Sequence, residues 1–155
     1  MFRRLLSLAN SRNIRIIAIN RRDYPGSLPL KAEEVAPLTL PEGPEALDGF
    51  RSFMRDRALE FLQFVGWMID DGIIKNLSEP EGRKSGGVSI IGWSGGNRIL
   101  LALLGNLSQF PSELVGKLGH YMRSLIIYGK QSLSTSSWSN YADVARLQNV
   151  RVTQS

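Results

Sequence analysis

The sequence of 155 residues contains no cysteine, a single histidine and no long uninterrupted run of apolar residues. The absence of cysteine excludes disulfides, thiolate metal sites and a cysteine nucleophile. With one histidine, the chain also lacks the usual ligands of a zinc site, so no metal is expected. No stretch approaches the roughly eighteen apolar residues of a membrane-spanning helix, so no membrane span is expected.

Charged residues are spread thinly along the chain. Nineteen Lys and Arg against fourteen Asp and Glu give a formal net charge of +5. The basic residues occur in separated pairs, such as Arg3-Arg4 and Arg21-Arg22, without a long basic run. Such pairs are typical of a solvated surface rather than of a phosphate-binding stripe, so no nucleic-acid partner is expected.

The first nine residues are mostly apolar, but the run is broken at Ser7. Phe2, Leu5, Leu6 and Ala9 recur at helical spacing. This pattern predicts a short packed amphipathic helix rather than a secretory signal, whose apolar core would be longer. A cytoplasmic location is expected, and a mitochondrial presequence stays open as the alternative.

Helices and strands alternate along the following residues. An isoleucine-rich run predicts a buried strand at 14–20, and a proline-rich irregular connection follows from 21 to 48. Apolar residues spaced by three and four predict a long helix at 46–75, in which Trp67 is expected to pack in the core.

Further along, short apolar runs predict buried strands at 88–91 and 123–128, with a helix at 97–107 between them. The alternation of helix and strand predicts an α/β fold, with a parallel sheet flanked by helices. Residues 1–128 carry this pattern and form the predicted core. Residues 129–155, which include Trp138, match it poorly and are predicted to form a flexible tail.

The motif Gly92-Trp93-Ser94-Gly95-Gly96 follows the predicted strand at 88–91 and leads into the next helix. A Gly-x-Ser-x-Gly turn in this setting holds a serine hydroxyl clear of the backbone, so Ser94 is the candidate nucleophile. Gly92 and Gly96 are expected to remove β-carbons that would collide at the turn. The Gly95 N–H, at the start of the helix, is the predicted donor to a developing oxyanion. The structural alternative is a glycine-rich turn that only packs tightly or binds a phosphate; the absence of Gly-x-Gly-x-x-Gly and Walker patterns disfavours the phosphate version.

With this turn, residues 1–128 resemble the α/β-hydrolase superfamily. The segment from Asn20 to Ser27 is similar to the family's Asp-x-Arg-Gly-x-Gly-x-Ser loop, with Asn20 in place of the aspartate. The helix at 46–75 and the strand at 123–128 then correspond to the elements on either side of the nucleophile strand. The resemblance implies a partial α/β-hydrolase fold and a serine hydrolase that acts on ester-like bonds of a small-molecule substrate, without a cofactor.

Members of the family carry an acid and then a histidine after the nucleophile. The candidates here are His120, which precedes the strand at 123–128, and Asp143, which lies in the tail, so both depart from that order. A helix-end histidine and a solvated helix residue are the alternative interpretations. The family's loop with the second oxyanion donor would precede Met1. The resemblance therefore implies a truncated member whose catalytic machinery is incomplete.

Two further hypotheses remain open. In the first, the chain is a non-catalytic binding or interaction module, which keeps the turn for packing and associates with itself through exposed sheet edges. In the second, it is an enzyme whose catalytic site is completed by His120 or by another chain. Trp93, next to the nucleophile, and Tyr24, after the first predicted strand, are the candidate pocket residues.

Overall fold

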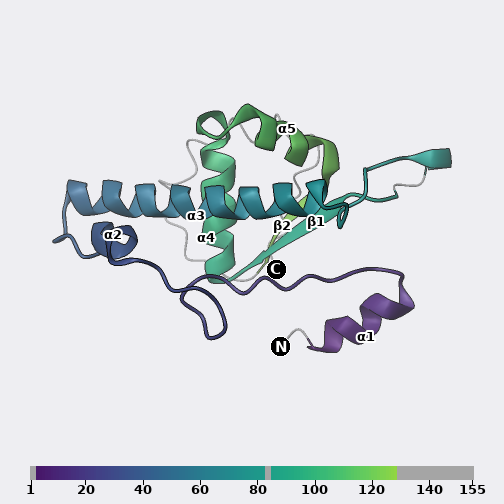
Figure 1. Cartoon of the computed structure of the whole chain (residues 1–155), viewed down its shortest axis with the longest axis horizontal. Coiled ribbons are helices and arrows are strands. Elements are labelled where there is room, and N and C mark those ends of the chain that lie inside the picture. Colours follow the sequence, from purple (N-terminus) through teal and green to yellow (C-terminus); the bar gives the residue numbers. More distant parts are fainter. Residues whose placement is uncertain (1–2, 83–84, 129–155) are drawn as a thin grey trace. The chain divides into compact units, whose positions relative to one another are not determined.

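A computed structural model describes residues 3–82 and 85–128 (Figure 1). The chain divides into two compact units, Met1–Ala36 and Pro37–Ser155. Helices and strands are mixed, and two parallel strands form one sheet. The predicted α/β class is confirmed at this level. None of the helices in the described ranges is long and apolar enough to cross a membrane, as expected from the sequence.

The first unit contains two short helices, α1 (Arg3–Ser11) and α2 (Ala32–Val35). The strand predicted at 14–20 is wrong, because these residues have no regular secondary structure. Ile14, Ile17 and Ile19 are exposed rather than buried. Isoleucine favours a strand where the side chain packs on a sheet. The two described strands, 88–93 and 122–128, pair only with each other, so residues 14–20 have no neighbouring strand to pair with.

Polar side chains hold the proline-rich connection of the first unit in shape. Arg22 donates two hydrogen bonds of 2.6 Å to the Glu34 carboxylate and one of 2.8 Å to the Pro29 carbonyl oxygen. The Asp23 carboxylate accepts a 2.7 Å hydrogen bond from the Leu30 N–H. The connection is less irregular than predicted, since α2 lies within it and a turn of 3₁₀ helix, η1 (Ala36–Leu38), follows.

The second unit begins with the long helix α3 (Pro44–Asp70), which confirms the predicted helix with slightly different ends. Pro44 occupies the first turn, where proline is tolerated, and Gly72 has a φ of +71° just beyond the last turn. The predicted apolar stripe is buried at Ala58, Leu62, Val65, Met68 and Ile69. The prediction for Trp67 is wrong: its side chain is 54% exposed, because it lies off this stripe.

The elements that carry the candidate site follow in the order η2 (Pro80–Gly82), β1 (Val88–Trp93), α4 (Gly95–Gly105), η3 (Leu107–Gln109), α5 (Ser112–Tyr121) and β2 (Met122–Tyr128). β1 and β2 are parallel, with Ile90 opposite Leu125 and Trp93 opposite Tyr128. A parallel pair needs a crossover connection, which α4, η3 and α5 provide. α5 was not predicted from the sequence, because its glycines lower helix propensity.

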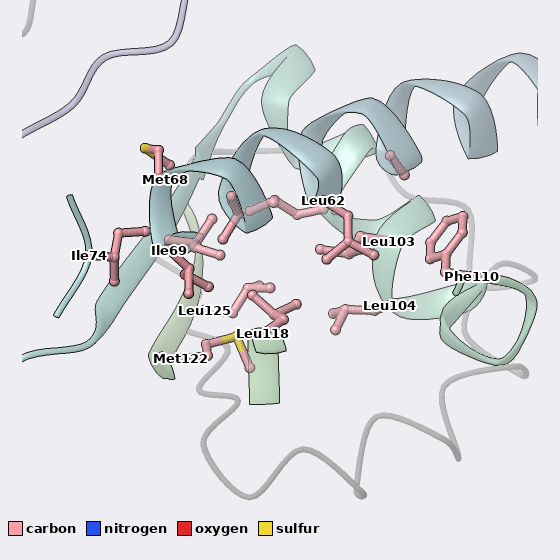
Figure 2. Packing of buried hydrophobic residues seen from close by; sticks show 14 residues of the cluster. Leu62, Met68, Ile69, Ile74, Leu103, Leu104, Phe110, Leu118, Met122 and Leu125 are labelled. Atoms are coloured by element: carbon pink, nitrogen blue, oxygen red, sulfur yellow. The ribbon is translucent and has the colours of Figure 1, made fainter. Parts of the chain in front are cut away.

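One apolar core joins α3, α4, α5 and the inner face of the sheet. Figure 2 shows Leu62 of α3, Leu103 of α4, Leu118 of α5 and Leu125 of β2 pointing into the same space. Each of these four leucines is at most 1% exposed. The packing of three helices on two strands therefore fixes the position of the turn between β1 and α4.

The opposite face of the sheet is exposed. Along β1 the burial alternates, so that Ile90 is 7% exposed and its neighbour Ile91 is 63% exposed. Trp93 and Tyr128, which are paired at the end of the ladder, are 42% and 53% exposed. Both faces of a parallel sheet are usually covered by helices. In the described part of the second unit, the helices pack on the inner face.

Candidate functional site

Ser94 lies between the last residue of β1 and the first residue of α4. Its φ of +50° and ψ of −122° put it in a region that residues other than glycine rarely adopt. Such a conformation is strained by roughly 1–3 kcal/mol and persists only where the surroundings fix it. The side chain is exposed. The strand, sharp turn and helix predicted from the motif are therefore present.

Gly92 and Gly96 flank this serine, but only Gly92 meets the steric requirement proposed for both. A β-carbon on Gly92 would lie 2.5 Å from Asn97 Oδ1 and 2.8 Å from Leu100 Cδ1. A β-carbon on Gly96 would meet no atom within 4 Å. The prediction for Gly96 is wrong, because Gly96 lies in the first turn of α4, where a side chain would point into open space.

Gly95 is the first residue of α4. The first N–H groups of an α-helix have no carbonyl partner within the helix. The aligned peptide dipoles also make this end of a helix electropositive. The Gly95 N–H therefore lies beside the candidate nucleophile, in a position suited to a developing negative charge.

Asn97 is a residue of the turn that the sequence analysis missed. It is fully buried, at 0% exposure, in the first turn of α4. Its N–H donates a 3.0 Å hydrogen bond to the Ser94 carbonyl oxygen. Its Nδ2 donates a second bond, also 3.0 Å, to the Tyr128 carbonyl oxygen. The available signal was its spacing from Leu100 and Leu104, which puts an amide on the apolar stripe of a helix.

His120 is not brought together with Ser94. His120 is exposed near the end of α5, two residues before Met122, which pairs with Val88 at the first residue of β1. Ser94 follows the last residue of the same strand. The intervening strand is about 16 Å long. A base must reach the nucleophile within hydrogen-bond distance, so His120 does not fulfil that role in this arrangement.

His120 instead lines a shallow hollow with Asn76, Leu77, Lys117 and Tyr121. Lys117 Nζ donates hydrogen bonds to the Asp70 carboxylate at 2.8 and 2.9 Å and lies 3.1 Å from Glu113 Oε1. These hydrogen bonds, first that to Asp70 and then that to Glu113, raise the pKa of Lys117 above its ordinary value. Lys117, the cation that lines this hollow, is thus paired with two carboxylates. The hollow lies near the end of the sheet that is remote from Ser94.

The remaining candidates belong to different parts of the chain. Tyr24 belongs to the first unit and is half exposed, with the Arg21 guanidinium 5.0 Å from its ring centre and donating a 2.6 Å hydrogen bond to its hydroxyl. In the loop that resembles the family's segment, Asn20 Nδ2 donates to the Pro25 carbonyl oxygen at 2.9 Å. Trp93 lies on the outer face of β1, next to Ser94. Asp143 and Trp138 fall outside the described residues.

Within residues 3–82 and 85–128, no group of three or more His, Asp or Glu side chains is placed to hold a metal ion. Comparison of the chain with models of protein families, with curated proteins and with solved structures gave no match.

Proposed function

We propose that the protein is a serine hydrolase of the α/β-hydrolase type, in which Ser94 is the nucleophile toward ester-like acyl bonds. The observation that carries this proposal is the backbone of Ser94, strained at a φ of +50° between a parallel strand and a helix. The exposure of Ser94 and the adjacent start of α4 support it. The partial α/β-hydrolase fold is part of the same proposal and is supported by the sequence resemblance and by this strand, turn and helix.

In the proposed reaction, Ser94 Oγ bonds to the acyl carbon while the carbonyl π bond breaks, so that the carbonyl oxygen becomes negatively charged. The intermediate then re-forms the carbonyl and expels the alcohol, which takes up the serine proton, and water afterwards hydrolyses the acyl-Ser94 ester to release the acid. The Gly95 N–H donates a hydrogen bond to the negatively charged oxygen, and the N-terminal end of α4 adds a favourable electrostatic potential. Removing one such donor from an established enzyme lowers the rate about 10²- to 10³-fold. The contribution of Gly95 is therefore a substantial part of the proposed activity.

The proton of Ser94 needs an acceptor, because a serine hydroxyl is a weak nucleophile at neutral pH. His120, the single histidine of the chain, lies near the other end of the strands, so the acceptor is a different group. Loss of the nucleophile or the base in a serine protease lowers kcat by about 10⁶-fold. We therefore propose that this chain is catalytically incomplete by itself and hydrolyses esters slowly.

The test is the rate of covalent labelling by a fluorophosphonate, which reacts with activated serines. Wild type, Ser94→Ala, Ser89→Ala and His120→Ala are compared, and the labelled peptide is identified by mass spectrometry. Ser89 is the matched control, since it is an exposed serine on β1, the strand that leads into Ser94. We expect slow labelling at residue 94 in every protein except Ser94→Ala. Equal labelling of wild type and Ser94→Ala would overturn the proposal.

A second candidate function, that of an interaction module, is favoured by the exposed outer face of the sheet. Ile91, Trp93 and Tyr128 form an apolar surface there, and the proposed partner is a second copy of the chain. Light scattering tests this candidate: a mass that rises with protein concentration supports it, whereas a monomer over the whole range excludes it. Such a result is independent of fluorophosphonate labelling.

A further inference from the structure

Asn97 is the one polar side chain that the described residues bury completely. It shares the buried stripe of α4 with Leu100, Leu103 and Leu104. A leucine at position 97 would match the other side chains of this apolar stripe, and no amide would have to lose its contact with water. Apolar packing alone therefore does not account for an asparagine at this position.

The orientation of the amide follows from its partner. The Tyr128 carbonyl oxygen can only accept a hydrogen bond, so Nδ2 faces it at 3.0 Å. Tyr128 is the last residue of β2 and lies opposite Trp93, the residue before Ser94. The side chain of Asn97 therefore joins the start of α4 to the carboxyl end of the neighbouring strand, 31 residues away in the sequence.

The other end of the amide faces Gly92. Oδ1 is buried and has no hydrogen-bond partner among the described residues. The β-carbon position of Gly92 lies 2.5 Å from this oxygen, which means that a Cα hydrogen of Gly92 points at it. A C–H···O contact is weak, so it does not replace a full hydrogen bond. A buried acceptor without a hydrogen bond lowers stability. The presence of Asn97 therefore needs an explanation other than stability.

Three contacts of one residue thus surround the turn. The backbone N–H of Asn97 binds the Ser94 carbonyl oxygen, Nδ2 binds the end of β2, and Oδ1 lies against Gly92, two residues before Ser94. We propose that Asn97 is a positioning residue, which holds the strained backbone of Ser94 in the conformation that presents its hydroxyl. This inference rests on the proposed function for its effect on reactivity, but not for its effect on the geometry of the turn.

The first variant is Asn97→Leu, which keeps the branched shape and removes both polar atoms. Three quantities are measured: the urea midpoint, the labelling rate of Ser94, and the hydrogen-exchange rate of the residue 97 amide, whose bond to Ser94 reports the turn. We expect stability close to that of wild type, labelling about 10- to 100-fold slower, and amide exchange at least about tenfold faster. A displacement of 1 Å at a reacting group is enough for about a 10²-fold loss.

The second variant, Asn97→Asp, is reversible by pH. An ionised carboxylate cannot donate to the Tyr128 carbonyl oxygen, whereas a protonated one can. Burial raises the pKa of such an aspartate above its usual value of about 4. We expect the labelling and exchange rates, taken relative to wild type at each pH, to approach wild-type values as the pH is lowered.

Asn106→Leu is the matched control, because Asn106 Nδ2 also donates to a backbone carbonyl oxygen, that of Ala102, but at the far end of α4. It is expected to leave the labelling rate unchanged. Wild-type labelling and amide exchange in Asn97→Leu would overturn the inference, as would a loss that only follows the fraction unfolded. If wild type itself is not labelled, the proposed function fails, and amide exchange still decides whether Asn97 holds the turn.

Discussion

At the scale of single residues, the turn depends on how closely Gly92 approaches α4. The strain at Ser94 is tolerated because neighbouring atoms leave the backbone little room to relax. Asn97 and Leu100 fill the space in front of Gly92, and their contacts leave no volume for a methyl group. Packing therefore explains why residue 92 is a glycine. Its backbone angles do not, since the φ of Gly92 is not positive.

Gly92→Ala is expected to lower the free energy of unfolding by about 1–3 kcal/mol, because the added methyl group overlaps Asn97 and Leu100. The matched control is Gly96→Ala, in the first turn of α4, where the methyl group meets nothing within 4 Å. Alanine favours a helix over glycine, so this control is expected to be neutral or to gain up to about 1 kcal/mol. Urea denaturation monitored by circular dichroism measures both, and equal effects would contradict the packing argument.

At the scale of elements, Lys117 joins α5 to α3 through its hydrogen bonds to Asp70. These bonds raise the pKa of Lys117 above its ordinary value of 10.5, so they stabilise the fold while the lysine is protonated. The contribution is fully present below pH 10.5 and is lost as the pH rises through the raised pKa of the folded state. Alkaline conditions should thus weaken the attachment of α5.

Lys117→Met is therefore expected to be less stable than wild type at pH 8, with a difference that shrinks above pH 10.5. The free energy of unfolding in urea, measured for both proteins across this range, checks the expectation. Asp70→Asn is the partner control and should remove most of the effect of the lysine substitution. A difference that is constant with pH would show that the lysine acts through its alkyl chain alone.

The elements differ in how far the sequence could predict them. α3 and the β1–turn–α4 unit could be predicted, because their apolar spacing, and Gly92 in the turn, agree with the packing that the fold adopts. The strand at 14–20 could not, since a β-branched run predicts a strand without showing that a neighbouring strand exists. α5 was missed because Gly116 and Gly119 weaken the local helical signal, and its contacts with α3 come from far away in the sequence.

The site shows the same division. The sharp turn at Ser94 could be predicted, because the motif requires a particular local backbone conformation. The remoteness of His120 could not, because it depends on the register of β1 with β2. The bond from Asn97 to Tyr128 likewise joins residues that only the fold brings together.

At the scale of the whole molecule, the same substitution is expected to change the free energy of unfolding differently on the two faces of the sheet. Ile90→Thr on the inner face is expected to lower the free energy of unfolding by about 2 kcal/mol, because it replaces an ethyl group of the core with a buried hydroxyl. Ile91→Thr, the next residue on the exposed face, is expected to change it by no more than about 0.5 kcal/mol.

Both threonine variants are measured by urea denaturation at low protein concentration, and the series is repeated at high concentration. Threonine suits a strand as well as isoleucine does, so strand propensity is matched between the two sites. A large effect of Ile91→Thr at low concentration would mean that the outer face is covered within one molecule. An effect that emerges only at high concentration would instead support association between copies.

The parallel ladder of β1 and β2 has a consequence for synthesis on the ribosome. Trp93 pairs with Tyr128, and the amide of Asn97 binds the carbonyl oxygen of that same tyrosine. A nascent chain that has just emerged as far as residue 100 therefore contains the whole glycine-serine motif but not Tyr128, the partner of both residues. If Ser94 is the nucleophile that we propose, its hydroxyl is held in place only after a further stretch of about thirty residues has left the exit tunnel. A ribosome-bound intermediate stalled before that point should then be inert toward a serine-directed probe.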